Sequence, residues 1–468
     1  MPGEMEIAEL RREFHGALIR PADPNYDRER ALYNAMIDKR PALIARCNDV
    51  ADVMTAVKFA RSRNLKVAVR GGGHNGAGLA SCNDGLMIDL ARLDGVHVEP
   101  GRREVRVSGG CTQGDMDHAT HAFGLAVPSG IVSTTGVAGL TLGGGHGYLS
   151  RRYGLTIDNL LEADVVLADG HMVKASEREN ADLFWGLRGG GGNFGIVTSF
   201  LFRAHPVSHV YGGPIFWDIR HASDVMRAYR EFLPAAPESL CPFIGLKTVP
   251  STAPFPEPLW GKRVCALICC FDGSAEDGER ALRPLRAAVP TPVLNGLSEM
   301  PFPAMQSLFD PLLPKGLQWY WKADFVRDLS DAAIEAHIEQ ALQSPTELSL
   351  MHLYPIDGAV RRVGEADTAW RYRDATWSMV ICGIDPRPEN ATLLEQWGRR
   401  YWRAVHPFNA EGAYVNFLMD DEEEGRIKAT YGGNYAALVE LKKKIDPANF
   451  FSGNQNISPS AKLPGSRS

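Results

Sequence analysis

The stretch VAVRGGGHNGAG, residues 67–78, decides how the rest of the sequence is interpreted. A short apolar segment runs into three consecutive glycines, and His74 follows directly behind them. Glycine permits positive φ angles and a close approach of the backbone to a ligand, and successive backbone N–H groups in such a turn form a site for an anion. The segment is therefore either a ligand-binding loop that presents a histidine or a tight turn with an incidental polar residue.

Composition and charge narrow the class of protein. The chain has 468 residues, 44% hydrophobic and 23% charged, with a formal net charge of −6. This is typical of a globular protein of about two to three domains, and it indicates neither a nucleic-acid partner nor an anionic membrane. The charged N-terminal segment lacks the apolar core of a signal peptide, and no apolar run is long enough to span a bilayer. The eight cysteines have no zinc-binding or disulfide spacing. We expect a cytoplasmic protein without a metal site.

The glycines are concentrated in the first part of the chain, at 71–78, 109–114, 136–147 and 186–195. Apolar strands separate these clusters, which indicates a backbone wrapped around a large ligand rather than a disordered tract. After about residue 206, strand-like and helix-like stretches alternate, which predicts an antiparallel sheet with helices on one face. Residues 431–459 predict a helix and then an Asn-rich extended tail. The strand-like stretches of the second region are 212–219, 263–273, 317–326, 347–357 and 377–385.

Two other sequence motifs, a glycine run and a histidine pair, do not predict the sites that their spacing suggests. Gly190, Gly192 and Gly195 match G-x-G-x-x-G, but a dinucleotide fingerprint follows a strand and opens a helix. Here a predicted helix precedes the glycines and a strand follows, so we do not expect a Rossmann fold. His118 and His121 lack neighbouring carboxylate or thiol ligands and are interpreted as a pair on a helix surface.

Five segments considered together resemble one family. They are VRGGGHNGAG at 69–78, the long glycine-rich stretch 128–170, DLFWGLRGGGGNFGIVT at 182–198, AYVNF at 413–417 and DPANFFSGNQNISP at 446–459. In this order and spacing they resemble the berberine-bridge-enzyme-like FAD-linked oxidases of the vanillyl-alcohol-oxidase superfamily, over nearly the whole chain.

The resemblance implies an α+β fold with a two-part PCMH-type FAD-binding domain. Residues 1–206 would form the FAD-binding domain, and 418–468 would be a C-terminal segment that returns to it. Residues 207–417 would be an inserted substrate-binding domain, an antiparallel sheet covered by helices.

The resemblance also implies how FAD is held. In this family the glycine turn binds the pyrophosphate, and its histidine, here His74, is bonded to the flavin 8α-methyl group. Many relatives carry a second bond from a cysteine to flavin C6, but Val132 stands at that position, so we expect no cysteinyl bond. The other cofactor-binding residues implied are Arg70, Gly71, Gly72, Gly73, Asn75, Gly76, Ser129, Gly130, Thr134, Thr135, Gly136, Gly139, Gly144, Gly145, Gly147, Gly195, Val197 and Asn454.

Three residues are candidates for catalysis. Tyr414 and Asn416 match the Y-x-N motif whose tyrosine acts as the base in this family. A phenol with its ordinary pKa of about 10 needs help from a cation or a hydrogen-bond donor. His146 matches a position that faces the flavin, where an imidazole donates, accepts or relays a proton; the alternative is a packed loop histidine.

Substrate-binding residues are expected on strands of the second domain, where alternate side chains share a face. On 317–325 either Trp319 and Trp321 point inward, or Gln318, Tyr320 and Lys322 do. We take Tyr320 as the candidate.

On 349–355 the alternatives are His352 with Tyr354 or Met351 with Leu353. We favour His352 and Tyr354, because polar groups directed away from the core need no buried partner.

The function expected is oxidation of a small organic or secondary-metabolite substrate, at an alcohol, an amine or an activated C–H bond, possibly with cyclisation. O₂ would be reduced to H₂O₂, with room beside the small side chains of 134–136. The alternatives are a carbohydrate oxidase that forms lactones, a flavin dehydrogenase with another electron acceptor, and a non-catalytic flavin-binding protein.

Overall fold

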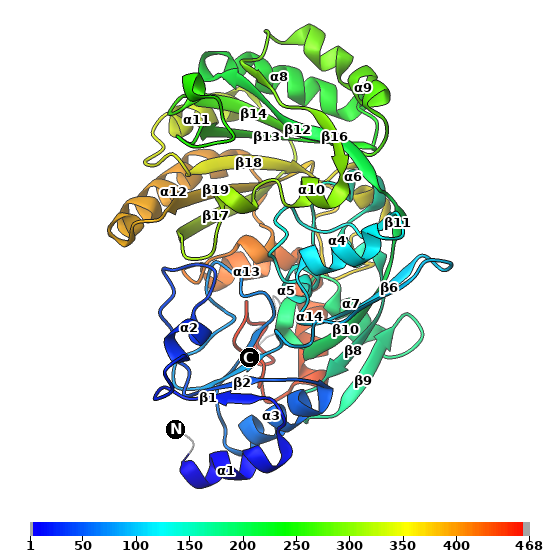
Figure 1. The fold of residues 1–468 in the computed structure, drawn as a ribbon, viewed down its shortest axis with the longest axis vertical. Coiled ribbons are helices and arrows are strands. Elements are labelled where there is room, and N and C mark those ends of the chain that lie inside the picture. The colour runs from blue at the N-terminus through cyan, green and yellow to red at the C-terminus, as the bar shows by residue number, and fades with distance from the viewer. Residues whose placement is uncertain (1–2, 462–468) are drawn as a thin grey trace, which may run out of the picture.

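The fold has two parts stacked along its long axis, as Figure 1 shows. The computed structural model describes residues 3–461. The lower part in Figure 1 holds the first strands of the chain together with the C-terminal helices, and the upper part holds strands and helices from the middle of the chain. The structure combines helices with mostly antiparallel sheets, which confirms the α+β class expected from the sequence.

A small mixed sheet lies nearest the N-terminus, in the order β1-β2-β4-β3. Helix α3 connects β2 to β3, and both strands pair in parallel with β4. Asp49 caps α3 by accepting the backbone N–H of Asp52, as an N-cap aspartate does. The glycine turn after residue 70 therefore leaves the carboxyl edge of this sheet, where ligands bind in such folds. The bounds are α1 (Glu4–Glu13), β1 (Ala17–Ile19), α2 (Tyr26–Arg30), β2 (Leu43–Arg46), α3 (Val50–Ser62), β3 (Val67–Arg70) and β4 (Leu86–Asp89).

A five-stranded antiparallel sheet follows, in the order β5-β6-β10-β8-β9. A hairpin turn at 169–170 connects β8 to β9, and Gly170 there has a φ of 80°. Helix α7 precedes the glycine run and β10 follows it, the reverse of a Rossmann fingerprint. The bounds are β5 (Val96–Glu99), β6 (Glu104–Ser108), α4 (Gln113–His121), β7 (Leu125–Ala126), α5 (Val137–Leu142), α6 (Ser150–Tyr153), β8 (Leu160–Val166), β9 (Met172–Ser176), α7 (Ala181–Leu187), β10 (Ile196–Arg203) and β11 (His205–Pro206).

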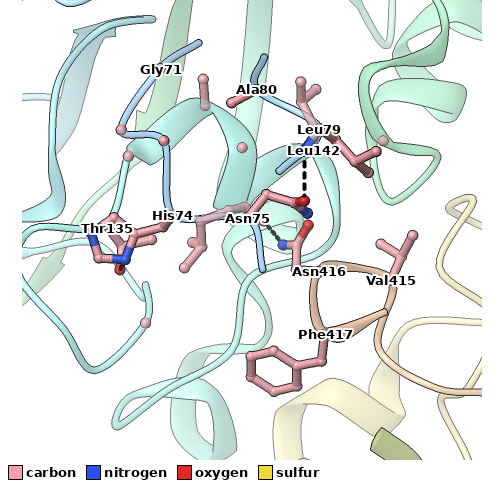
Figure 2. Close-up of a pocket in the computed structure, with 18 of the residues that line it drawn as sticks. Gly71, His74, Asn75, Leu79, Ala80, Thr135, Leu142, Val415, Asn416 and Phe417 are labelled. Carbon is pink, nitrogen blue, oxygen red and sulfur yellow. Dashed lines mark hydrogen bonds between the residues drawn. The ribbon is translucent and has the colours of Figure 1, made fainter. Parts of the chain in front are cut away.

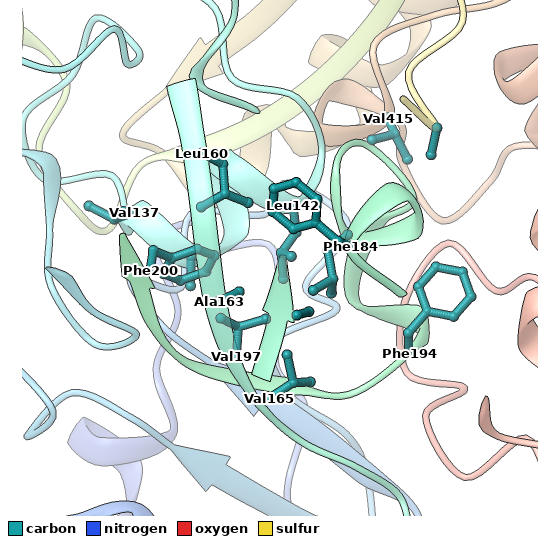
Figure 3. Packing of buried hydrophobic residues seen from close by; sticks show 14 of the residues in the cluster. Val137, Leu142, Leu160, Ala163, Val165, Phe184, Phe194, Val197, Phe200 and Val415 are labelled. Atoms are coloured by element: carbon teal, nitrogen blue, oxygen red, sulfur yellow. The ribbon is translucent and has the colours of Figure 1, made fainter. Parts of the chain in front are cut away.

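The C-terminal helices pack on this five-stranded sheet. Tyr431, at the end of α13 (Glu424–Tyr431), and Leu438 of α14 (Tyr435–Ile445) belong to the same apolar cluster as Phe200 of β10. Figure 3 shows part of this cluster, in which Val415 joins Phe184 and Leu142. Segments from both ends of the chain thus share one core.

The buried Lys442 connects the C-terminal segment to the glycine run. The Lys442 ammonium donates to the carbonyl oxygens of Asn193 and Phe451 at 2.7 and 3.0 Å and pairs with Asp446 at 2.8 Å. Both members of the ion pair are fully buried. A buried charge is tolerated when it is paired and hydrogen-bonded, so these contacts hold the glycine run and the tail together.

The upper part is an antiparallel sheet in the order β15-β12-β14-β13-β18-β19-β17, with β16 paired to β12. Residues such as Ile244, Met351 and Ile381 face helices α8, α9, α11 and α12, whereas Phe243, Tyr354 and Val380 face the lower part. The bounds are β12 (His209–Asp218), α8 (Ala222–Phe232), β13 (Leu240–Thr248), β14 (Arg263–Phe271), α9 (Ala275–Ala288), β15 (Leu294–Asn295), β16 (Ser298–Pro301), α10 (Phe302–Gln306), β17 (Gln318–Val326), α11 (Asp331–Ala341), β18 (Leu350–Pro355), β19 (Trp377–Asp385) and α12 (Ala391–Val405).

The predicted strands omitted β13, which lies between β14 and β18 in this sheet. Pro242 and Gly245 interrupt its sequence pattern, and both residues are depleted from strand interiors. Tertiary pairing with two neighbours overrides that local preference. Within residues 3–461, no helix is long and apolar enough to cross a bilayer.

Candidate active site

A cavity of about 340 Å³ lies between the two parts of the fold. It begins at the glycine turn after β3, passes α5 and the glycine run at 191–195, and reaches the lower face of β17, β18 and β19. Figure 2 shows His74 and Thr135 on one side of the pocket and Asn416 with Phe417 on another. The predicted site residues that line it are Gly71, Gly72, Gly73, His74, Asn75, Gly130, Thr135, Gly136, Gly139, His146, Gly195, Val197, His352, Tyr354, Tyr414, Asn416 and Asn454.

His74 is held on several sides. Its Nε2 lies 3.0 Å from Thr134 Oγ1 and its Nδ1 lies 3.4 Å from Thr135 Oγ1. The Tyr33 ring stacks on the imidazole, with centroids 3.8 Å apart and planes 17° from parallel. Burial lowers the pKa of His74 to about 4. At neutral pH the ring is therefore uncharged and has a nitrogen lone pair.

The glycine turn packs against the loop that ends at α5 with no room for side chains. A Cβ on Gly72 would lie 2.3 Å from the backbone nitrogen of Gly136, and Gly73 has a φ of 71°. Farther along the cavity, a Cβ on Gly139 or Gly192 would meet no atom within 4 Å, although both residues line the wall. The cavity thus has a bare backbone lining on two sides.

Two amide side chains of the lining also carry a buried polar atom without a partner among the described residues. Gln113 Nε2 and Asn454 Oδ1 are buried side-chain atoms for which the described residues supply no hydrogen bond, and both residues line the cavity. Buried polar groups are normally paired. Glycine backbone and orphaned amides are suited to a phosphate- and heteroatom-rich group, so the residues present fit FAD.

Tyr414 lies at the other end of the site. Its hydroxyl oxygen accepts hydrogen bonds from the Gly145 backbone N–H at 3.0 Å and from Asn416 Nδ2 at 2.8 Å. Burial raises the pKa of Tyr414 to about 12, while these two donors oppose the rise. Donors directed at the oxygen stabilise the phenolate relative to the phenol, which is the help that a tyrosine base requires.

His146 is buried beside Tyr414. The two ring centroids are 4.4 Å apart, and His146 Nε2 lies 3.1 Å from Ser378 Oγ. Burial lowers the pKa of His146 to about 3, and its Nδ1 has no partner among the described residues. His146 therefore lines the cavity as a neutral ring whose Nδ1 is buried without a hydrogen-bond partner in the described part of the chain.

The sheet supplies the opposite wall. His352 and Tyr354 both line the cavity, with His352 Nε2 3.1 Å from the Tyr354 hydroxyl. On β17, Trp319 and Trp321 line the cavity. Tyr320 does not line it, which corrects our choice on this strand.

The cause lies on the opposite face of β17. Tyr320 donates its hydroxyl hydrogen to Asp421 at 2.7 Å, and Lys322 pairs with Asp421 and Glu422 at 3.0 and 2.7 Å. Because these acidic partners lie on that face, Tyr320 and Lys322 point toward them, and the two tryptophans point into the cavity.

Some of the expected cofactor-binding residues do not line the cavity but contact residues or loops that do. Arg70 pairs with Asp89 at 2.8 Å, Thr134 contacts His74, and Gly145 donates to Tyr414. Each holds a lining residue or its loop in place. The residues of the expected set that do not line the cavity are Arg70, Gly76, Ser129, Thr134, Gly144, Gly145 and Gly147.

Other lining residues were not among the predicted cofactor- or substrate-binding residues. Tyr33 lies far from any motif and reaches His74 only through the fold. Gln113, Gln455 and Phe417 also line the cavity. Gly191 and Gly192 of the glycine run line the cavity beside the predicted Gly195. Val132 also lines the cavity.

Comparisons with known proteins agree with this geometry. The FAD binding domain family model matches residues 41–176, and the model described as berberine and berberine like matches residues 413–458. An FAD-linked oxidoreductase of Dictyostelium discoideum is 30% identical over 456 residues, covering 97% of each chain. The (R)-6-hydroxynicotine oxidase of Paenarthrobacter nicotinovorans is 38% identical over 205 residues, 44% of this chain and 45% of the relative.

Solved structures share the fold over nearly the full length. The BBE-like 1 protein of Physcomitrella patens matches with a TM-score of 0.84 at 25% identity, covering 95% of this chain and 97% of that one. The 6-hydroxy-D-nicotine oxidase of Arthrobacter nicotinovorans matches with a TM-score of 0.85 at 24% identity, covering 96% and 98%. The chain therefore belongs to the berberine-bridge-enzyme-like family of FAD-linked oxidoreductases.

Proposed function

We propose that this protein is an oxidase that carries FAD on a single covalent bond from His74 and oxidises a small organic molecule while reducing O₂ to H₂O₂. The observation that carries the proposal is one continuous cavity that joins His74 to Tyr414. The substrate would be oxidised at an alcohol, an amine or an activated C–H bond. The likeness to an enzyme named for nicotine oxidation supports this range.

His74 is suited to form the bond. Its pKa of about 4 leaves a neutral ring, and Tyr33 with Thr134 restricts the ring's movement. His74 would hold the flavin through its 8α-methyl group, and O₂ would accept, as H₂O₂, the two electrons and two protons that this oxidation releases. Val132 offers no nucleophile for a second bond.

Cys382 also lines the cavity, on the opposite wall. Burial raises the pKa of its thiol, and the thiolate is the nucleophilic form of cysteine. A protonated thiol on β19 is a poor candidate for attachment, which again leaves His74.

Tyr414 is the proposed base. Bound FAD would supply the site that accepts a hydride from the substrate. Tyr414 Oη would take the accompanying proton, and the N–H groups of Gly145 and Asn416 would stabilise its developing negative charge. His146 Nδ1 has no partner among the described residues and would orient a substrate hydroxyl or amine. The apolar wall of Trp319 and Trp321 would exclude water.

We also propose that residues 1–206 and 418–468 form the FAD-binding part and that 207–417 form an inserted substrate-binding part. The shared core of Phe200, Tyr431 and Leu438 supports this division, as do the contacts of Lys442 with Asn193. The last residues, 462–468, lie outside the described part of the chain.

The test begins with the purified protein. After denaturation in acid the protein should remain yellow, and peptide mass spectrometry should place flavin on the peptide that contains His74. A His74→Ala variant should release its flavin on denaturation. Flavin on a cysteine-containing peptide, or flavin released entirely from the parent protein, would contradict the single histidyl bond.

A second measurement tests oxidase activity. Candidate alcohols and amines are mixed with the holoenzyme without oxygen, and loss of flavin absorbance identifies a substrate. Admission of air should restore the absorbance and yield H₂O₂. Fast reoxidation by an artificial acceptor combined with slow reoxidation by air would indicate a dehydrogenase instead.

A further inference from the structure

One lysine on the cavity face of the large sheet has no acidic partner within residues 3–461, although it does not itself line the cavity. Lys247 of β13 lies opposite Leu350 of β18, and Gly245 lies opposite His352. Leu350 and His352 both line the cavity. Since directly paired residues of an antiparallel sheet share a face, Lys247 points from the same face as these two lining residues.

The surroundings of Lys247 are apolar. Its Nζ lies 5.6 Å from the centre of the Phe255 ring, and its neighbours in the pairing row are Leu350 and Val264. Lys247 is half-buried, and burial lowers its pKa to about 8 with no carboxylate opposing the effect. An ammonium group in such a place is poorly solvated, and an anion brought by a ligand would stabilise it.

His352, diagonally opposite Lys247 on the neighbouring strand, supplies a second hydrogen-bond donor. Burial keeps the Tyr354 phenol protonated and raises its pKa. Burial also lowers the pKa of His352 to about 3, so the imidazole is neutral. We therefore assign the Tyr354 hydroxyl as donor to His352 Nε2, which places the His352 proton on Nδ1.

The two donors are spaced for a small anion. Lys247 and His352 are diagonal neighbours across the strand pair, with backbone positions roughly 7–8 Å apart, within reach of long side chains. Gly245 stands between them in the same face, and a Cβ there would lie 3.2 Å from the His352 Cβ, so His352 packs over this glycine. A carboxylate accepts hydrogen bonds from an ammonium and from an imidazole N–H, which are the two donors that these residues offer.

We propose that Lys247 and His352 form a carboxylate-binding subsite, and that the substrate of the function proposed above is an apolar or aromatic carboxylic acid. Rings lie in sequence from Tyr414 to His146, Tyr354 and His352, with neighbouring centroids 4.4, 4.9 and 4.4 Å apart. The carboxylate would therefore be held beyond His352, and the group that is oxidised would lie toward Tyr414. This inference rests on the proposed function and adds the class of substrate.

The test uses the flavin-loaded full-length protein and two probes of the same shape, benzoate and benzamide. Binding is followed by changes in flavin absorbance and, independently, by titration calorimetry. Benzoate should bind the parent protein at least about tenfold more tightly than benzamide, in line with a charged hydrogen bond. Lys247→Met should abolish this preference without changing benzamide binding.

Two further variants serve as controls. Lys247→Gln keeps a polar side chain without the charge and should behave like Lys247→Met. Lys262 is exposed in the turn before β14, and Lys262→Met removes the same charge while leaving benzoate binding at the parent value. Equal benzoate affinity in the parent and in both Lys247 variants would overturn the subsite, as would equal binding of benzoate and benzamide in the parent.

The result is separable from the proposed function. A protein that retains covalent flavin but shows no preference for benzoate refutes the subsite alone. A protein without flavin on His74 refutes the mode of attachment and leaves the calorimetric comparison of the two probes to judge the subsite.

Discussion

Replacing Tyr414 by phenylalanine removes one oxygen atom that accepts two hydrogen bonds. Asn416 Nδ2 keeps a second acceptor, the Leu140 carbonyl oxygen at 3.1 Å, whereas the Gly145 N–H loses the acceptor at 3.0 Å. A buried donor left without a partner costs about 1–3 kcal/mol. We expect Tyr414→Phe to lower the free energy of unfolding by about that amount and to retain its flavin.

The effect on catalysis should be larger than the effect on stability. Loss of a positioned base lowers the rate by about 10² to 10⁴-fold, which is roughly 3–5 kcal/mol in the activation free energy. The pKa of about 12 also predicts the pH dependence. Below that pH the phenolate fraction grows as pH rises, so the parent rate should increase with pH, and the Tyr414→Phe rate should not.

The assay is the anaerobic reduction of the flavin by a substrate, followed in a stopped-flow spectrometer from pH 6 to 9. Tyr372→Phe is the matched control, because the Tyr372 hydroxyl donates to the Ala429 carbonyl oxygen at 2.8 Å and does not line the cavity. It should lose stability to a similar extent and keep the parent rate. A Tyr414→Phe rate within about threefold of the parent, with the same pH profile, would refute the assignment and move the base to His146.

Two further predictions concern stability and assembly. Burial raises the pKa of Asp117 to about 7, whereas the pKa in the unfolded chain is about 3.9. Between these two pH values the folded state holds a proton that the unfolded state has lost. The free energy of unfolding therefore falls by up to about 4 kcal/mol as the pH rises from 4 to 7. Asp117→Asn should remove this loss, so its urea midpoint should rise relative to the parent over that range; parallel pH profiles would show that Asp117 does not titrate in this way. A chain that ends at residue 417 lacks Tyr431, Leu438 and the Lys442 contacts and should be insoluble or fail to attach flavin, whereas a soluble truncated chain with covalent flavin would contradict the two-part FAD-binding unit.

The family, the fold class and the use of FAD could be predicted from local sequence, and the comparisons confirm them. The reason is physical. Close backbone packing of Gly72 on Gly136 excludes any Cβ, so the requirement appears in the sequence as glycine. Gly170, in the turn between β8 and β9, has a φ of 80°, which likewise favours glycine.

Contacts between distant segments could not be predicted in this way. Alternation along β17 predicts two faces, but only the position of Asp421 on one side decides that Tyr320 turns away from the cavity. Strand β13 forms against the local preference of Pro242 and Gly245 because β14 and β18 supply its hydrogen bonds. The stacking of Tyr33 on His74 likewise joins segments that are far apart in the sequence. Side-chain periodicity is a local property of the chain, whereas the partner that each face meets depends on the whole fold.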